Sequence, residues 1–116
     1  MDPSPAPVEV RKDEMRRLYE ARLDGQVVGE LAYETAGGHV SLTHSYVDPD
    51  RRHQGIASAL ARFALEDLSR GQGSIGVYCG FVADFVAGHP EFNDAVDIRR
   101  SAFRATRTAR ATDRER

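Results

Sequence analysis

Residues 47–68 read VDPDRRHQGIASALARFALEDL, and this stretch decides how the rest of the chain folds around it. It begins where an alternating apolar and polar pattern ends, breaks at Asp48-Pro49, and enters a helix at or near Gly55. The helix carries an apolar stripe with the 3.6-residue period of one buried face. The stripe consists of Ile56, Leu60, Phe63, Ala64 and Leu68. We therefore expect a strand, a polar loop and an amphipathic helix in succession.

The start of this helix is suited to an anion. The first turn of a helix leaves backbone N–H groups unpaired and carries a partial positive charge. Arg51 and Arg52 come just before it, and Gly55 has no side chain to keep a ligand away from the backbone. The stretch therefore predicts a site for a diphosphate.

The residues upstream predict an antiparallel meander of three strands. The expected strands are Leu18–Leu23, residues 26–35 and His39–Val47. Asp24-Gly25 and Gly37-Gly38 supply the turns between them, because both pairs tolerate the positive φ angles of tight hairpins. Residues 8–17 are mostly charged and are compatible with an extended segment or with a helical turn.

The residues downstream predict a fourth strand and a second helix. Residues 74–79 (SIGVYC) form the expected strand, which makes a βαβ unit with the third strand and the central helix. Residues 81–87 form a short helix that ends at Gly88, and residues 91–96 pack loosely against the body. The expected fold class is α/β: a three-strand antiparallel meander, a βαβ unit and a short C-terminal helix.

The chain has 116 residues, enough for one domain. We expect a disordered lead-in at 1–7, the folded domain at 8–98 and a flexible Arg-rich tail at 99–116. Seven arginines and two acidic residues give that tail a charge of +5, which leaves −7 for the rest of a chain whose total is −2. No apolar run approaches the roughly 20 residues of a membrane helix. With one cysteine, the sequence favours a reduced, cytoplasmic protein without a membrane partner.

A second glycine motif runs from Gly71 to Gly76 and matches G-x-G-x-x-G. The dinucleotide-binding fingerprint follows a strand and opens a helix. Here the order is reversed, since the motif follows the central helix and leads into a strand. We interpret it as a helix stop and a turn.

Four short motifs together resemble a known family. They are Arg52-x-x-Gly55-x-Ala57, His44-Ser45-x-Val47, Cys79-x-Phe81 and His89-Pro90-Glu91-Phe92. Their order and spacing are similar to the short YjdJ-type branch of the GNAT N-acetyltransferase superfamily, over about residues 18–96. The chain departs from that pattern at Ser45, Tyr46 and Gly80.

The resemblance implies a minimal GNAT-like fold and an N-acetyltransferase that moves an acetyl group from acetyl-CoA, its co-substrate, to an unidentified amine. Backbone amides of the loop would hold the pyrophosphate, Arg51 or Arg52 would add charge, and the end of the third strand would meet the pantetheine arm. The implied cofactor-binding residues are Tyr46, Val47, Arg52, His53, Gln54, Gly55, Ile56 and Ala57.

Cys79 and His44 are the candidate catalytic residues. Cys79 just precedes the second helix, where a helix N-terminus favours the thiolate. The resemblance places it near the thioester, and the alternative is a buried packing residue. His44 alternates in phase with Val40 and Leu42, so we expect it on the covered face of the sheet, as a core residue or in proton transfer. The histidines and the cysteine lack metal-ligand spacing, so no metal is expected.

Two other functions stay open. The first is an acyl-CoA-binding protein without catalysis, because the chain is too short for much of an acceptor-binding region. The second is an interaction module whose Arg-rich tail binds nucleic acid or an acidic partner. We favour a solvated tail over a nucleic-acid contact.

Overall fold

The computed structural model describes residues 8–52, 54–71, 73–97 and 101. Within them, five strands form one sheet in the order β1-β2-β3-β4-β5. The strands are β1 (Glu9–Asp13), β2 (Leu18–Leu23), β3 (Gln26–Ala36), β4 (His39–Val47) and β5 (Ile75–Val77). The first four are antiparallel neighbours, and β5 is parallel to β4.

The meander has four strands rather than the expected three. β2 and β4 have the predicted bounds, and β3 is one residue longer than predicted. The additional strand is β1, a charged edge strand that pairs only with β2. Its sequence, EVRKD, has no apolar face that would mark it as a strand. Pairing with a neighbour, not local pattern, makes this segment extended.

Both predicted hairpin turns are confirmed. Asp24 and Gly25 have φ angles of 53° and 80°, and Gly37 and Gly38 have φ angles of 56° and 83°. Two successive positive φ angles are typical of a two-residue type I′ turn, whose twist matches that of the flanking strands.

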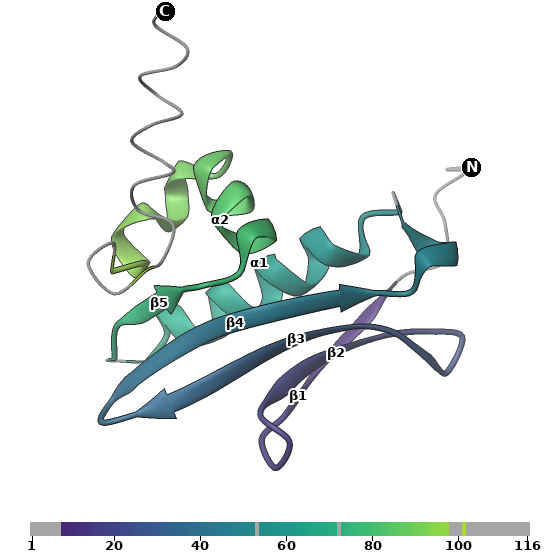
Figure 1. The fold of residues 1–116 in the computed structure, drawn as a ribbon, viewed down its shortest axis with the longest axis horizontal. Coiled ribbons are helices and arrows are strands. Elements are labelled where there is room, and N and C mark those ends of the chain that lie inside the picture. The colour runs from purple at the N-terminus through teal and green to yellow at the C-terminus, as the bar shows by residue number, and fades with distance from the viewer. Residues whose placement is uncertain (1–7, 53, 72, 98–100, 102–116) are drawn as a thin grey trace, which may run out of the picture.

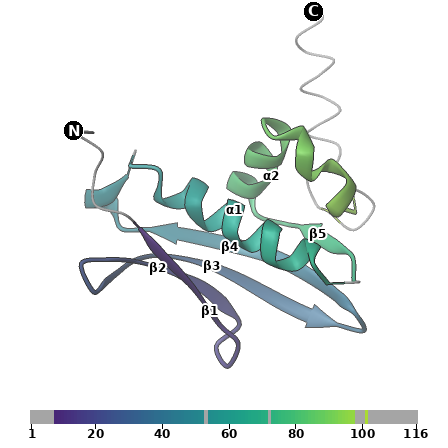
Figure 2. The same cartoon turned by 180° about the vertical axis from the view of Figure 1, so that it is seen from behind.

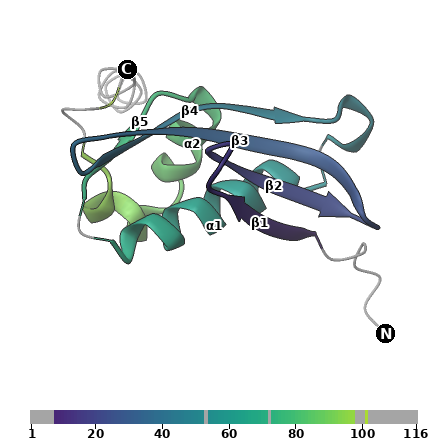
Figure 3. The same ribbon diagram turned by 90° about the horizontal axis from the view of Figure 1, so that it is seen from below.

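The helices α1, α2 and η2 lie on one face of the sheet, and η1 lies just beyond the end of β4, as Figures 1 and 2 show from opposite sides. They are α1 (Ile56–Ser69), α2 (Gly80–Ala87) and the short 3-10 turns η1 (Pro49–Arg51) and η2 (Pro90–Ala95). Figure 3 shows α1 running along the sheet as a second layer. None of the helices in the described part of the chain is long and apolar enough to cross a membrane.

The buried stripe of α1 differs from the predicted one. Its fully buried members are Ile56, Leu60, Ala61, Ala64 and Leu65. Phe63 is 37% exposed and meets the ring of Tyr19 edge-on, with 5.9 Å between the ring centroids. The small side chains of Ala61 and Ala64 let the helix lie close to the sheet. Phe63 lies at the edge of this buried arc of the helix, so its ring is at the rim of the contact.

A polar group of three residues ties α1 to the sheet. Tyr19 is fully buried, and its hydroxyl donates to the Asp67 carboxylate (2.9 Å). Lys12 Nζ lies 2.9 Å from the same carboxylate. Burial and the hydrogen bond to Asp67 both raise the pKa of Tyr19. For Asp67, burial acts to raise the pKa, but hydrogen bonds from Lys12 and Tyr19 outweigh it and lower the pKa.

A β-bulge in β4 overturns the prediction that His44 lies on the covered face. Ala32 pairs with His44, whereas the next residue of β3, Tyr33, pairs with Leu42, so Thr43 is the extra residue. From this extra residue onward, the side chains of β4 point to the opposite faces from those that strict alternation predicts. His44 is therefore exposed on the face away from α1, and Ser45, the partner of buried Leu31, lies on the α1 face.

The outer edge of β5 is also occupied. Val96 forms a parallel bridge with Ile75, and the Asp97 N–H donates to the Ile75 carbonyl (2.8 Å). The Ser101 hydroxyl accepts from the Val77 N–H (2.9 Å). Residues 91–96 are held more firmly than predicted, because Phe92 and Val96 are buried in the core.

Candidate functional site

β4 and β5 separate after a short parallel ladder. The ladder joins Val40–Leu42 to Ile75–Val77, and its last bond runs from the Tyr78 N–H to the Leu42 carbonyl (2.8 Å). The chain then turns away into α2, while β4 continues to Val47 (Figure 1). In the part of the chain that the structure describes, residues 43–47 of β4 therefore pair with β3 on one side and have no strand on the side of β5.

This free edge presents backbone groups. The Asp48 N–H donates to the Val28 carbonyl of β3 (2.8 Å). Because successive backbone N–H groups of a strand point to opposite sides, the N–H of Val47 faces the free edge. A linear ligand laid beside β4 can bond there as an added strand does.

A cavity of about 450 Å³ joins the end of β4 to the start of α1. Its walls come from β4, from the loop and first turn of α1, and from the first turn of α2. The lining residues are Ser45, Tyr46, Val47, Arg51, Arg52, Gly55, Ile56, Ala57, Ser58 and Phe81.

The start of α1 is open toward this cavity. Gly55 precedes the helix with φ 81°, no side chain caps the first turn, and that turn holds no acidic residue. The Ala59 N–H makes the first intrahelical bond, to the Gly55 carbonyl, so the preceding three amides are those that a helix start leaves unpaired. A Cβ atom on Gly55 would meet nothing within 4 Å. Ile56, Ala57 and Ser58, which carry these amides, all line the cavity.

The charge of the cavity is positive. Arg51 and Arg52 line it, and among the described residues neither forms an ion pair. The nearby Asp48 carboxylate accepts from the Asp50 N–H (3.0 Å) and caps η1 instead. Unpaired amides, a helix N-terminus and two free guanidinium groups fit a diphosphate.

The structure brings most of the predicted cofactor-binding residues to this cavity. Tyr46, Val47, Arg52, Gly55, Ile56 and Ala57 line it. Gln54 is exposed and is not part of the lining, and His53 lies outside the described residues.

Four lining residues were not in the predicted set: Ser45, Arg51, Ser58 and Phe81. Ser58 could have been predicted by counting the free amides at a helix start, and Arg51 could have been predicted from its place beside Arg52. Ser45 and Phe81 reach the cavity through the bulge and the placement of α2, which no local pattern reveals.

The two candidate catalytic residues lie on opposite faces of β4. Cys79 is 6% exposed, precedes α2 and does not line the cavity. Its thiol donates to the Ser45 hydroxyl, with 3.4 Å between Sγ and Oγ. His44 is exposed on the other face. The structure therefore joins Cys79 to the cavity through Ser45 and keeps His44 apart from both.

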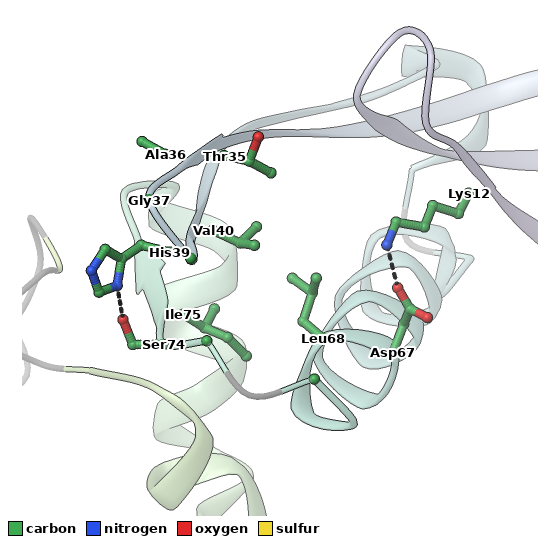
Figure 4. A pocket seen from close by; sticks show the side chains of 13 residues that line it. Lys12, Thr35, Ala36, Gly37, His39, Val40, Asp67, Leu68, Ser74 and Ile75 are labelled. Carbon is green, nitrogen blue, oxygen red and sulfur yellow. Dashed lines mark hydrogen bonds and ion pairs between the residues drawn. The ribbon is translucent and has the colours of Figure 1, made fainter.

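A second cavity, of about 410 Å³, lies at the opposite end of β4 beside the β3–β4 turn. Figure 4 shows two polar pairs on its sides with apolar residues between them. Lys12 Nζ lies 2.9 Å from Asp67, and His39 Nδ1 lies 2.6 Å from the Ser74 hydroxyl. Because the charged and ring groups of both pairs are already engaged with each other, this cavity offers a ligand less than the first.

The Gly71–Gly76 motif borders the second cavity. α1 ends at Ser69 and β5 begins at Ile75, so the predicted order of helix, turn and strand is confirmed. A Cβ atom on Gly73 would lie 1.8 Å from the Gly38 carbonyl oxygen. This glycine is required because two turns pack closely, not because a ligand approaches.

A family model described as GCN5-related N-acetyl-transferase matches residues 18–95 of the chain. The match runs from the start of β2 to the end of η2. It includes the free edge of β4, the start of α1 and all the residues that line the first cavity. A search of curated proteins finds no match.

Proposed function

The chain belongs to the GCN5-related N-acetyltransferase (GNAT) family, and from this premise we propose that it binds acetyl-CoA and transfers its acetyl group to an amine. One observation carries the proposal. A single cavity of about 450 Å³ joins the unpaired edge of β4 to the uncapped N-terminus of α1. A ligand with a diphosphate and a long amide-bearing arm has complementary partners at both ends.

In this proposal the diphosphate lies on the backbone amides at the start of α1. Gly55, Ile56 and Ala57 supply open backbone, and Arg51 and Arg52 supply charge. The predicted loop residues His53 and Gln54 complete the loop in sequence. An anion at this position is stabilised by both the free N–H groups and the helix dipole.

The pantetheine arm follows the free edge of β4 at Tyr46 and Val47. The Tyr46 side chain is 55% exposed, so this residue leaves the cavity room for a ligand at its backbone. The Val47 N–H faces the free edge and donates to an amide carbonyl of the arm.

The reaction class is acyl transfer. The amine nitrogen forms a bond to the acetyl carbon, the carbon–sulfur bond breaks, and the proton lost by the amine balances the one gained by the departing thiol. We propose direct attack, because Cys79 is buried and outside the cavity lining. We propose His44 as the group that accepts the amine proton, which requires the acceptor amine to reach the acetyl group through the gap between β4 and β5, from the face on which His44 is exposed.

The proposal also covers the branch of the family, the bounds of the domain and the cellular location. The four sequence motifs support the short YjdJ-type branch. We propose a domain at 8–98, a lead-in at 1–7 and a tail at 99–116, with Ser101 still bonded to β5. A reduced thiol at Cys79 agrees with a cytoplasmic location.

Two measurements test the proposal. Calorimetric titration with acetyl-CoA should show one site per chain. Incubation with acetyl-CoA and a set of primary amines should release CoA thiol faster than either component alone. Binding without release favours the acyl-CoA-binding alternative, and a failure of acetyl-CoA to bind overturns the proposal.

A further inference from the structure

The Ser45 hydroxyl is an available donor on the wall of the cavity. It accepts the hydrogen bond from the Cys79 thiol (3.4 Å), and within the described ranges it donates to no acceptor. A hydroxyl has one proton to donate and two lone pairs. With one lone pair engaged by the thiol, the proton remains for a ligand.

Ser45 and Cys79 lie where the opening between β4 and β5 is narrow. The last bond between the strands joins Tyr78 to Leu42. Cys79 is the next residue after Tyr78, and Ser45 is three residues beyond Leu42 on the other side. Arg51, Arg52 and the start of α1 lie at the far end of the cavity from this junction.

This arrangement orients a linear ligand. If its phosphates lie at the start of α1 and its arm follows β4 from Val47, the arm runs toward Ser45. In acetyl-CoA the end of the arm is the thioester. A carbonyl oxygen and a free hydroxyl donor are then brought to the same end of the cavity.

We propose that Ser45 gives the site its preference for acetyl-CoA over free CoA by donating a hydrogen bond to the thioester carbonyl, and that Cys79 is a positioning residue that holds the Ser45 hydroxyl. This inference rests on the proposed function. It states that the site distinguishes acetyl-CoA from free CoA, which has no carbonyl at this end.

The burial of Cys79 explains why a thiol suits the positioning role. The side chain is 6% exposed, and its S–H is directed at Ser45. A thiol is a weak donor, so it limits the rotation of the hydroxyl without competing for the acceptor on the ligand. Its own proton stays on sulfur while it donates, which separates this role from that of a nucleophile.

The test is a comparison of affinities and does not depend on turnover. Acetyl-CoA and CoA are titrated by calorimetry into the wild-type chain, Ser45→Ala and Ser45→Thr. The preference for acetyl-CoA over CoA should fall about fivefold in Ser45→Ala, the contribution of one ordinary hydrogen bond. Ser45→Thr keeps the hydroxyl and should keep the preference.

Two variants of Cys79 separate positioning from packing. Positioning predicts that Cys79→Ser, which keeps a donor, retains the preference, while Cys79→Ala loses part of it. Packing as a small apolar residue predicts the reverse order, with alanine tolerated and serine harmful. Circular dichroism and melting curves show whether each variant is folded.

The outcomes separate this inference from the proposed function. If the wild-type chain does not bind acetyl-CoA, the proposed function fails. If it binds acetyl-CoA and Ser45→Ala keeps the full preference, or the wild-type chain shows no preference over CoA, only the role of Ser45 is overturned. If Cys79→Ala exceeds Cys79→Ser in preference, the positioning role of Cys79 is overturned.

Discussion

Gly55 and Gly73 show two different physical needs for a residue without a side chain. Around Gly55 the space is open, and its φ of 81° is one that other residues adopt only with strain. Around Gly73 the Gly38 carbonyl occupies the place of a Cβ atom. The first glycine leaves room for a ligand, and the second leaves room for the protein itself.

The open space at Gly55 predicts a charge-dependent loss of binding. In Gly55→Glu the carboxylate occupies the position proposed for the diphosphate, whereas Gly55→Gln places a neutral group of the same size there. Both variants should lose about 1 kcal/mol of stability from the strained φ angle. Acetyl-CoA should bind at least about tenfold more weakly to the Glu variant than to the Gln variant, because like charges repel. Calorimetry measures this, and equal affinities would remove the diphosphate from this position.

The crowding at Gly73 predicts that a substitution there lowers stability, and Gly71 offers a control position nearby. Gly73→Ala forces two turns apart and should cost about 2 kcal/mol or more in the free energy of unfolding. Gly71→Ala is the matched control, because the nearest atom to its Cβ would be the Leu68 carbonyl oxygen at 3.4 Å. It should change stability by no more than about 0.5 kcal/mol. Urea unfolding compares the two, and similar losses would contradict the packing explanation.

At the scale of the elements, Asp67 makes the polar part of the contact between α1 and the sheet. This carboxylate receives Lys12 from β1 and Tyr19 from β2. Lys12 Nζ also lies 5.7 Å and 5.5 Å from the ring centroids of Tyr19 and Tyr33. β1, the strand that the sequence pattern does not reveal, is thereby fastened to the helix as well as to β2.

Asp67→Asn tests this fastening through its pH dependence. The lowered pKa of Asp67 means that its contribution is complete above the unfolded value of about 3.8 and is lost as the pH falls through the folded value. At pH 7 the variant should lose about 1 to 2 kcal/mol, since the carboxylate is partly exposed. The difference from wild type should shrink below about pH 4. Asp24→Asn, which removes a carboxylate from an exposed turn, is the control and should change the free energy of unfolding at pH 7 by no more than about 0.5 kcal/mol.

The contacts among Lys12, Tyr19 and Asp67 also predict how stability changes at alkaline pH. The pKa values of Lys12 and Tyr19 are raised, so their contribution is complete below the unfolded values and is lost as the pH rises past about 10. In wild type, the contribution of this group to the free energy of unfolding should therefore stay level from pH 8 to about pH 10 and fall above it, which unfolding curves from pH 8 to 11 measure.

At the scale of the whole molecule, a ligand that binds only the folded chain raises its melting temperature. Acetyl-CoA at about one hundred times its Kd should add about 2.7 kcal/mol of stability. NADH should produce no shift through Gly71–Gly76, because this segment follows the C-terminal end of α1, where the helix dipole is negative. Differential scanning fluorimetry compares the two ligands. A shift with NADH and none with acetyl-CoA would reverse the assignment of the two glycine motifs.

Removal of residues 102–116 tests the interaction-module alternative, with circular dichroism to compare the fold of the two forms. The cut follows Ser101, so the hydrogen bond to Val77 is kept. The shortened chain should keep its affinity for acetyl-CoA within about twofold, because Phe81 is the last of the described residues that line the cavity. Neither form should bind duplex DNA at about 0.15 M salt. Tail-dependent, salt-sensitive binding would support the alternative.

The sequence by itself determined the parts of this protein that depend on near neighbours. The turns at Asp24-Gly25 and Gly37-Gly38 and the start of α1 at Gly55 follow from local backbone preferences, and the strand alternation and helix period follow from side chains a few residues apart. Most of the residues that line the cavity fall within one such stretch. The four motifs led to the family because their spacing is a property of the chain, not of its packing.

Only the tertiary structure decided which side chains meet across the chain. The bulge at Thr43 turned His44 outward and Ser45 inward, and strand pairing created β1. The packing of α1 on the sheet leaves Phe63 at the rim of their contact. Cys79 meets Ser45 at the point where the chain after β5 leaves β4. Each of these depends on register or packing between segments far apart in sequence. The free energy that selects them comes from burial against distant neighbours, which local periodicity does not record.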